Sequence, residues 1–198
     1  MIQNKCIIGL TGGIATGKSE VVKILKSLGY YVIDSDKVAH RVLELPEVLN
    51  KIKSTFGEEV VVNNKVQRNI LGEKVFGNEE NLKVLNEITH PVIIKNIIFE
   101  INSIEDDIIF VDIPLLIESK DTFKESNLNF SSIWLVYINK DLQVERLMAR
   151  DGIDEEYAKR KISSQMSIDD KVKYADVIIN NEGNRTKLKK QILDQLKK

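Results

Sequence analysis

At 198 residues, the chain is long enough for one substantial hydrophobic core with a small inserted subdomain. Hydrophobic residues make up 42% of it and charged residues 30%, a composition typical of a folded globular domain, which excludes wholesale disorder. With 29 basic and 30 acidic side chains the net charge is −1, so the chain has no overall basic field for binding nucleic acid or a membrane surface.

Short apolar runs rich in β-branched residues predict five strands, at about 5–10, 30–34, 108–113, 133–138 and 176–180. The first and third runs are continuously apolar rather than alternating. That pattern is typical of strands covered on both faces, as in a parallel sheet.

Segments with helical spacing separate these strands. Val21, Leu25 and Leu28 lie on one face of a predicted helix, and Gly29 follows where a C-cap glycine belongs. Pro91 is expected to open a later helix, since proline is favoured in a first turn. The alternation of strands and helices predicts an α/β fold with right-handed crossovers.

One interval breaks this alternation. Residues 38–103 contain several helical segments and no convincing buried strand. A helical insertion between the second and third strands would lie over the carboxyl edge of a parallel sheet, where ligands bind. We therefore predict a substrate-binding insertion here.

The loop after the first strand carries a phosphate-binding motif. Gly12 and the triplet Gly17-Lys18-Ser19 satisfy G-x-x-x-x-G-K-[ST] between a predicted strand and a predicted helix. Glycines let backbone N–H groups turn toward phosphate oxygens, and the helix N-terminus adds further donors. Lys18 is expected to reach the β- and γ-phosphates and the Ser19 hydroxyl to bind Mg²⁺. The loop residues expected to bind the phosphates of the nucleotide, which the family resemblance described below implies is ATP, are Gly13, Ile14, Ala15, Thr16, Gly17, Lys18 and Ser19.

Two carboxylates, Asp34 and Asp36, follow the second predicted strand. Beside a phosphate loop, such a group can accept the proton of an attacking hydroxyl or hold Mg²⁺ through water. Either residue could instead cap the next helix. Asp112, after the third strand, is another candidate for holding the metal through water. We interpret the pair as catalytic, and which of the two is the base stays open.

Other classes of protein fit less well. The run Asn139-Lys140-Asp141-Leu142 lacks the spacing of a guanine-reading motif, which disfavours a GTPase. His40 and His90 are the only histidines, and no cysteine pair is present, so a structural zinc site is not expected. A kinase for a nucleoside or nucleotide and a nucleotide-dependent switch remain the alternatives.

Motifs spread over nearly the whole chain resemble those of the dephospho-CoA kinase family. They are Leu10-Thr11-Gly12-Gly13-Ile14, Asp34-Ser35-Asp36 with Ala39-His40-Arg41, His90-Pro91, the run from Val111 to Glu118, Gln143-x-x-Arg146-x-x-x-Arg150, Gln165, Ala175-Asp176 and Asn180. A single element such as His-Pro would mean little, but the set in this order is specific.

The resemblance implies a P-loop kinase fold with a five-stranded parallel sheet flanked by helices. It implies ATP-dependent phosphorylation of the ribose 3′-hydroxyl of dephospho-CoA to give CoA, with Mg²⁺ as cofactor. The catalytic residues would be Lys18, Asp36, Asp34 and Arg150. Asp36 would face the acceptor hydroxyl, and Arg150 would close over the transferring phosphoryl group from a mobile helical lid.

The resemblance also implies ligand contacts outside the loop. Arg146 and Asn180 would bind ATP, with Asn180 near the adenine. The substrate-binding residues would be Thr11, Asp36, Arg41, His90, Pro91 and Leu115.

The expected organisation is a single P-loop kinase domain. Its core would comprise about 1–37, 104–140 and 169–198, with the insertion at about 38–103 and the lid at about 141–168. We expect a cytoplasmic monomer or weak homo-oligomer whose partners are ATP and dephospho-CoA, with no nucleic acid, membrane or signal peptide.

Two residues depart from the family pattern. Ala15 stands where the family loop often has glycine, and the loop is expected to keep its shape if φ is negative there. Glu20 replaces a small hydroxyl residue, but Ser19 still supplies the hydroxyl expected to face the metal.

Overall fold

The computed structural model describes residues 5–197. The chain forms two compact units: unit 1 contains the described residues of 1–33 and 105–198, and unit 2 contains Asp34–Ile104. The predicted insertion at 38–103 falls inside unit 2. The outermost ends of the predicted core, residues 1–4 and 198, lie outside the described residues.

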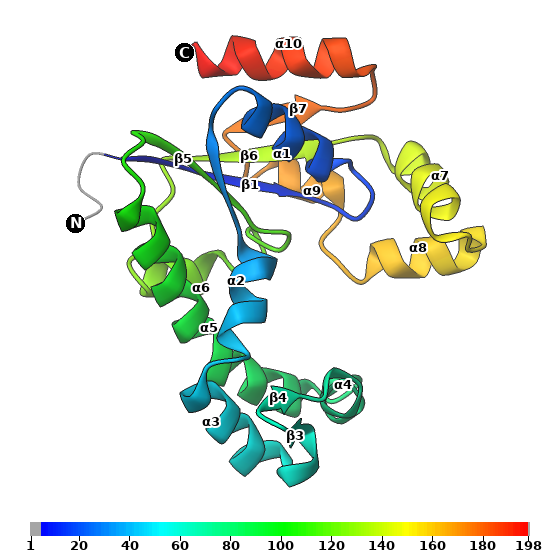
Figure 1. Ribbon diagram of the computed structural model, residues 1–198. Coiled ribbons are helices and arrows are strands. Elements are labelled where there is room, and N and C mark those ends of the chain that lie inside the picture. The colour runs from blue at the N-terminus through cyan, green and yellow to red at the C-terminus, as the bar shows by residue number, and fades with distance from the viewer. Residues whose placement is uncertain (1–4, 198) are drawn as a thin grey trace. The chain divides into compact units, whose positions relative to one another are not determined.

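Unit 1 is built on a five-stranded parallel sheet in the order β2-β5-β1-β6-β7 (Figure 1). The strands are β1 (Cys6–Gly12), β2 (Tyr31–Asp34), β5 (Ile108–Asp112), β6 (Ser132–Tyr137) and β7 (Val177–Asn180). All five predicted strands are confirmed, each to within two residues at either end. β1 occupies the centre of the sheet, with Leu10 opposite Asp112 of β5 and Gly12 opposite Val136 of β6. The loop that follows β1 therefore leaves the middle of the sheet edge.

Helices α1 (Lys18–Ser27) and α10 (Arg185–Leu196) pack on one face of this sheet (Figure 1). Their buried leucines and isoleucines join a cluster with strand residues that includes Phe110 and Trp134, whose rings meet edge to face at 5.2 Å. Gly29, at φ +90°, lies just beyond the last residue of α1 and confirms the predicted C-terminal glycine. This packing holds the start of α1 against the carboxyl end of β1.

A pair of helices, α7 (Lys140–Asp151) and α8 (Glu155–Ser163), lies at the end of the sheet where β1 leads into α1 (Figure 1). Gly152, at φ +65°, ends α7 and turns the chain, so the predicted helical hairpin is confirmed. The hairpin has its own apolar cluster, formed by Val144, Leu147, Ala158 and Ile162, and Ile14 and Ala15 of the phosphate loop pack against it. Two short helices complete unit 1: α6 (Lys120–Glu125) and α9 (Ile168–Val172).

Unit 2 is mainly helical. It contains α2 (Ser35–Val42), α3 (Pro46–Phe56), the 3₁₀ turn η1 (Glu58–Val60), β3 (Val61–Val62), β4 (Lys65–Val66), α4 (Arg68–Val75) and α5 (Glu79–Ser103). The long helix α5 contacts α2, α3 and α4. The antiparallel pair β3–β4 was not predicted, because a strand of two residues shows no periodicity.

The predicted start of a helix at Pro91 is wrong. Pro91 lies well inside α5, and the helix begins after Asn78, whose side chain accepts a hydrogen bond of 3.0 Å from Asn81 N. Glu79 and Glu80 add negative charge to the first turn. The apolar packing of α5 outweighs the one backbone hydrogen bond that proline removes. No helix within residues 5–197 has the length and apolar character needed to cross a membrane.

Candidate active site

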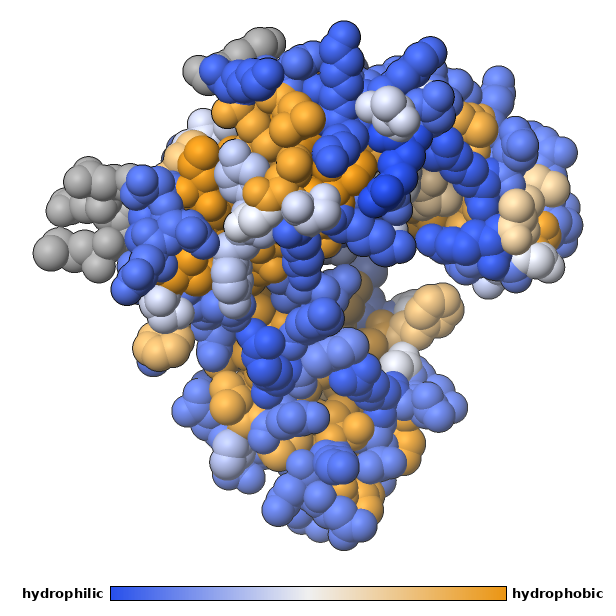
Figure 2. Space-filling view, turned by 45° about the horizontal axis from the view of Figure 1, so that its top comes forward, coloured by the Kyte–Doolittle hydropathy of each residue, from blue (hydrophilic) through white to orange (hydrophobic). Residues whose placement is uncertain are grey.

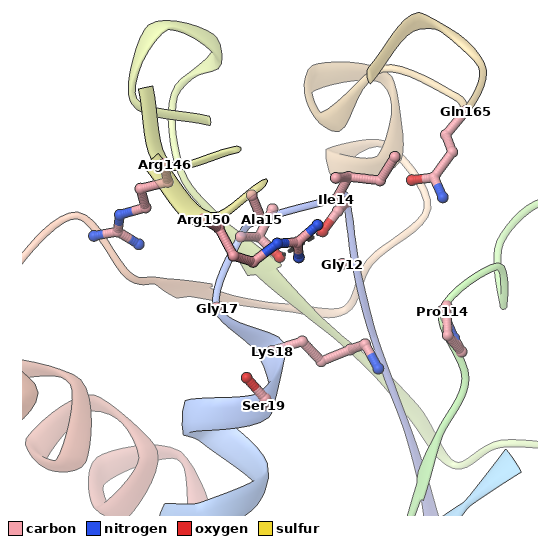
Figure 3. Close-up of a pocket in the computed structure, with 12 residues that line it drawn as sticks. Gly12, Ile14, Ala15, Gly17, Lys18, Ser19, Pro114, Arg146, Arg150 and Gln165 are labelled. Atoms are coloured by element: carbon pink, nitrogen blue, oxygen red, sulfur yellow. Dashed lines mark hydrogen bonds between the residues drawn. The ribbon is translucent and has the colours of Figure 1, made fainter. Parts of the chain in front are cut away.

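A pocket of about 470 Å³ lies over the phosphate loop of unit 1 (Figure 3). It is lined by Gly12, Gly13, Ile14, Ala15, Thr16, Gly17, Lys18, Ser19, Pro114, Arg146, Arg150 and Gln165. The structure thus brings together every predicted ATP-binding residue except Asn180. Pro114, which had no predicted role, also lines the pocket. Gln165 was named in the sequence analysis only as part of a motif, and it lies on the pocket wall as well.

Gly17 is required by the loop for two reasons. It has φ +84° and ψ 26°, the left-handed conformation, and caps the start of α1. A Cβ atom at this position would also collide with the side-chain amide of Asn181. No side chain caps the first turn of α1, and Glu20 N donates to Gly17 O at 2.9 Å, so the amides before Glu20 are the ones offered to a ligand.

Ala15 corrects one expectation about the loop. Its φ is +60° rather than negative, so an alanine occupies the left-handed region where glycine is normally found. That conformation costs an L-residue about 1–2 kcal/mol. The methyl group of Ala15 packs against the apolar cluster of α7 and α8, which offsets part of this cost. The loop therefore keeps its shape through tertiary contacts and not through a favourable φ.

Lys18 and Asp112 form an ion pair in which Lys18 Nζ donates to Asp112 Oδ1. Only 18% of the lysine side chain and 14% of the aspartate side chain are exposed. The pairing follows from the fold: Lys18 begins α1, and Asp112 ends β5, the neighbour of β1 in the sheet. Two residues predicted from separate motifs thus meet beside the pocket.

Two arginines one helical turn apart on α7 line the pocket, and in the view of Figure 3 the Arg150 side chain crosses the phosphate loop. Arg146 Nη2 donates to Asn181 O at 3.0 Å. Arg150 binds the Asp151 carboxylate through Nε at 2.7 Å and Nη2 at 3.3 Å. Hydrogen bonds from Arg150 and Lys161 lower the pKa of Asp151 to about 2, and the bond with Asp151 raises the pKa of Arg150. Arg150 thus stays fully cationic.

Asn180, expected near the adenine of ATP, does not line the pocket. Its backbone N–H and carbonyl are paired with the Gln191 side chain at 3.1 and 2.9 Å. Its side-chain oxygen accepts from Glu182 N at 2.9 Å. The next residue, Asn181, is the one that contacts the loop: it is 8% exposed, and its Nδ2 donates to Thr16 O at 2.9 Å. Periodicity does not distinguish two adjacent asparagines at the end of a strand.

Two predicted substrate-binding residues of unit 1 also lie outside the pocket wall. Thr11 is fully buried, and its hydroxyl donates to Pro114 O at 3.0 Å, so it supports the neighbouring wall rather than facing the pocket. Leu115 is 42% exposed. Two further residues without predicted roles, Gln143 and Lys171, also donate to loop carbonyls.

The remaining predicted residues belong to unit 2. Asp34 caps α2, with its Oδ1 accepting from Lys37 N at 3.1 Å, so the capping alternative is correct for this residue. Asp36 is exposed in the first turn of the same helix. Arg41 forms an ion pair with Glu100 at 2.8 Å. His90, beside Pro91 in α5, is half-buried, and this burial lowers the pKa of its imidazole.

No group of three or more His, Cys, Asp or Glu side chains within residues 5–197 is arranged to hold a metal ion. Among the side chains that line the pocket, Thr16 and Ser19 carry hydroxyls and Gln165 carries an amide oxygen, and the Thr16 hydroxyl already donates to Gly13 O at 3.0 Å. The Asp112 carboxylate does not line the pocket but pairs with Lys18, which does. A metal bound here would therefore need ligands from the nucleotide or from water.

Comparison with known proteins decides the family. The sequence profile described as "Dephospho-CoA kinase" matches residues 6–187. The chain belongs to the dephospho-CoA kinase family. A dephospho-CoA kinase of Carboxydothermus hydrogenoformans is 44% identical over 197 residues, covering 97% of this chain and 93% of the relative.

Solved structures agree with this assignment. A Thermus thermophilus protein superimposes with a TM-score of 0.83 at 31% identity, over 98% of this chain and 97% of that one. A dephospho-CoA kinase from Campylobacter jejuni gives a TM-score of 0.64 at 33% identity, over 98% and 96% of the two chains. The predicted P-loop kinase fold and the predicted kinase class are therefore confirmed.

Proposed function

We propose that this chain transfers the γ-phosphate of ATP to the ribose 3′-hydroxyl of dephospho-CoA, producing CoA. Membership of the dephospho-CoA kinase family supports this activity. The observation that carries it is the pocket of unit 1, where the phosphate loop, Lys18 and two arginines surround one space. Phosphoryl transfer asks a protein for this kind of positioning and charge stabilisation.

The donor side of the reaction would use the loop. Backbone N–H groups between Gly13 and Ser19 would bind the phosphates of ATP, and the N-terminal end of α1 would add its dipole. Lys18 would contact the β- and γ-phosphates. Its ion pair with Asp112 orients the ammonium group at the pocket in advance.

A divalent cation fits the donor set of this pocket. The Ser19 hydroxyl and the Asp112 carboxylate are hard oxygen ligands of the kind that Mg²⁺ prefers. We assign Ser19 as the direct ligand and Asp112 as a partner through water. Asp34 is the other candidate, but one of its oxygens already caps α2. The cation would neutralise the charge that develops on the phosphates.

The two arginines would act on the same phosphates. Arg146 would bind ATP, and Arg150 would stabilise the transferring phosphoryl group when the α7–α8 hairpin closes as a lid over the core. Because Asp151 binds Arg150 in a bidentate manner, it would fix the guanidinium in orientation. Closure would also keep water from the γ-phosphate and limit wasteful hydrolysis.

The acceptor side would use unit 2. Asp36 would accept the proton of the attacking hydroxyl. Asp34 would have only a supporting role, because one of its oxygens is already engaged as the cap of α2. Arg41, His90 and Pro91 would help to position dephospho-CoA. In unit 1, Leu115 would contribute to acceptor binding, and the buried Thr11 would contribute only indirectly, by holding Pro114 through its hydroxyl. Burial lowers the pKa of His90 and so favours its neutral imidazole, which would bind by hydrogen bonding rather than by charge.

We place the reaction in the cytoplasm, where ATP is the available donor. The two small-molecule substrates would be the only partners, with no nucleic acid or membrane, and the enzyme would act as a monomer or a weak homo-oligomer.

An acceptor assay tests the proposed function. The protein is mixed with Mg-ATP and, separately, with dephospho-CoA, a nucleoside, a nucleoside monophosphate or no acceptor, and ADP formation is followed. Fast turnover with dephospho-CoA alone is the expected result. Faster turnover with a nucleoside or nucleotide, or slow hydrolysis that no acceptor accelerates, would contradict it. Removal of divalent cations with EDTA should stop turnover, and added Mg²⁺ should restore it.

A further inference from the structure

Alternate carbonyl groups of the phosphate loop accept hydrogen bonds from side chains outside it. Lys171 Nζ donates to Gly12 O at 3.3 Å, and Gln143 Nε2 donates to Ile14 O at 2.7 Å. The third contact is the bond of 2.9 Å from Asn181 Nδ2 to Thr16 O. The three donors come from α9, from α7 and from the residue after β7. They are separate in sequence and converge only in the folded unit 1.

These bonds determine which way the intervening amides point. In a trans peptide, the carbonyl of one residue and the N–H of the next point in opposite directions, and no cis peptide bond occurs in the described chain. When Gly12 O, Ile14 O and Thr16 O are bound on the outside of the loop, the N–H groups of the following residues face the other way. Those residues, Gly13, Ala15 and Gly17, all line the pocket.

The three donors are deeply buried. Lys171 is 0% exposed, Gln143 is 2% exposed and Asn181 is 8% exposed. Lys171 is also paired with Glu118 at 2.8 Å, so its charge is compensated inside the protein. Buried donors in such surroundings have few alternative partners, which makes the three contacts effective restraints on the loop.

Gln143 carries a further indication that its role is not stability alone. Within the described residues, its Oε1 atom is buried and has no hydrogen-bond partner. A buried acceptor without a partner is unfavourable, so an apolar side chain of the same shape would suit the interior as well or better. What an apolar side chain does not provide is the amide donor that binds Ile14 O.

We propose that Lys171, Gln143 and Asn181 are positioning residues that orient the N–H groups of Gly13, Ala15 and Gly17, respectively, toward the phosphates of ATP. The inference rests on the proposed nucleotide-binding role of the loop. It assigns each outer contact to one particular amide. It also explains how the loop keeps Ala15 in the left-handed conformation, because the peptide before Ala15 is held from outside by Gln143.

The test uses the variants Gln143→Met and Asn181→Leu, which keep side-chain size and remove the donor. Binding of Mg-ATP and of dephospho-CoA is measured separately by calorimetry on the full chain. We expect the Kd for ATP to rise about tenfold in each variant, the scale of one lost hydrogen bond, with the Kd for dephospho-CoA unchanged. If Asn181→Leu does not fold, Asn181→Ala is measured in the same way.

Amide NMR spectra of the ¹⁵N-labelled protein supply the readout that a merely structural role would not produce. On addition of Mg-ATP, the Gly17 amide should lose its response in Asn181→Leu, and the Ala15 amide should lose its response in Gln143→Met. In each variant, the amides paired with the two unchanged donors should respond to Mg-ATP as they do in the wild type. Unchanged ATP affinity in both variants, or losses that do not follow this pairing, would overturn the inference.

Asn81→Leu is the matched control. Asn81 Nδ2 donates to Lys74 O at 2.8 Å, so this variant removes the same kind of bond from a carbonyl outside the loop. Its ATP affinity should stay that of the wild type. The outcome is separable from the proposed function: if the expected pattern of ATP binding is found but dephospho-CoA is not phosphorylated, the inference stands and the proposed function fails.

Discussion

Replacing Gly17 by alanine tests how the fold holds the phosphate loop. Gly17 has φ +84°, and a Cβ atom there would displace the Asn181 amide from Thr16 O. Gly29 offers a matched comparison, because its φ is +90° and nothing lies within 4 Å of the position of its Cβ atom. Alanine at residue 29 therefore introduces backbone strain alone, and alanine at residue 17 introduces strain together with the loss of a buried hydrogen bond.

The expected magnitudes follow from these two environments. The left-handed backbone conformation costs alanine about 1–2 kcal/mol. Alanine also reduces the conformational entropy of the unfolded chain relative to glycine, which stabilises the fold by about 0.4–1 kcal/mol. Gly29→Ala should therefore lower the free energy of unfolding by about 1 kcal/mol. Gly17→Ala should lower the free energy of unfolding by this amount and by about 1–3 kcal/mol more, because Thr16 O is left without its donor. For a chain of this size, each kcal/mol lowers Tm by about 2–4 °C.

Thermal and urea unfolding of the two variants, with ATP binding measured in parallel, check this reasoning. Gly29→Ala should lower Tm by a few degrees and keep the ATP affinity of the wild type. Gly17→Ala should lower Tm at least twice as far and weaken ATP binding. Equal losses of stability in the two variants would show that the contact between Asn181 and Thr16 contributes nothing, and the argument would be refuted.

Three further predictions concern the reaction and its pH dependence. Arg150→Ala should lower kcat by about 10³-fold with little change in Tm, because a clamping arginine acts in the transition state; a near-normal rate in steady-state kinetics would remove Arg150 from the mechanism. Asp36→Asn should retain ATP binding in calorimetry and lose turnover, and unchanged turnover would leave Asp36 without a catalytic role. The ion pairs of Asp151, with a folded pKa of about 2 against an ordinary 3.8, should stabilise the fold above about pH 4 and be lost as pH falls through about 2. A ¹³C titration of the Asp151 carboxyl should show this pKa rising in Arg150→Ala, and an identical titration in the variant would contradict the assignment.

Helix boundaries illustrate where sequence reasoning succeeded and where it failed. The five strands could be predicted because continuous apolar runs between polar turns leave little choice of structure. Pro91 misled because its preference for a first turn is a local tendency, whereas the packing of a long helix is a sum over many contacts. The true start at Asn78 carried its own signal, a capping side chain followed by two acidic residues.

The loop illustrates the same division at the level of single residues. Its sequence was enough to predict nucleotide binding, since glycines, a lysine and a serine at this spacing have few other uses. The φ of Ala15 could not be obtained from sequence, because it depends on packing against α7 and α8 and on the bond from Gln143. Asn181 could not be distinguished from Asn180, because only the end of β7 decides which of the two faces the loop.

The sequence by itself determined the family, the order of strands and helices along the chain, and the chemical groups available for phosphoryl transfer. These properties depend on local patterns and on motifs that a short stretch of chain contains completely. Only the tertiary structure decided that Lys18 pairs with Asp112, that Asp34 caps a helix, and that three distant side chains hold the loop from outside. Such contacts join residues up to 165 positions apart, and no local preference specifies them.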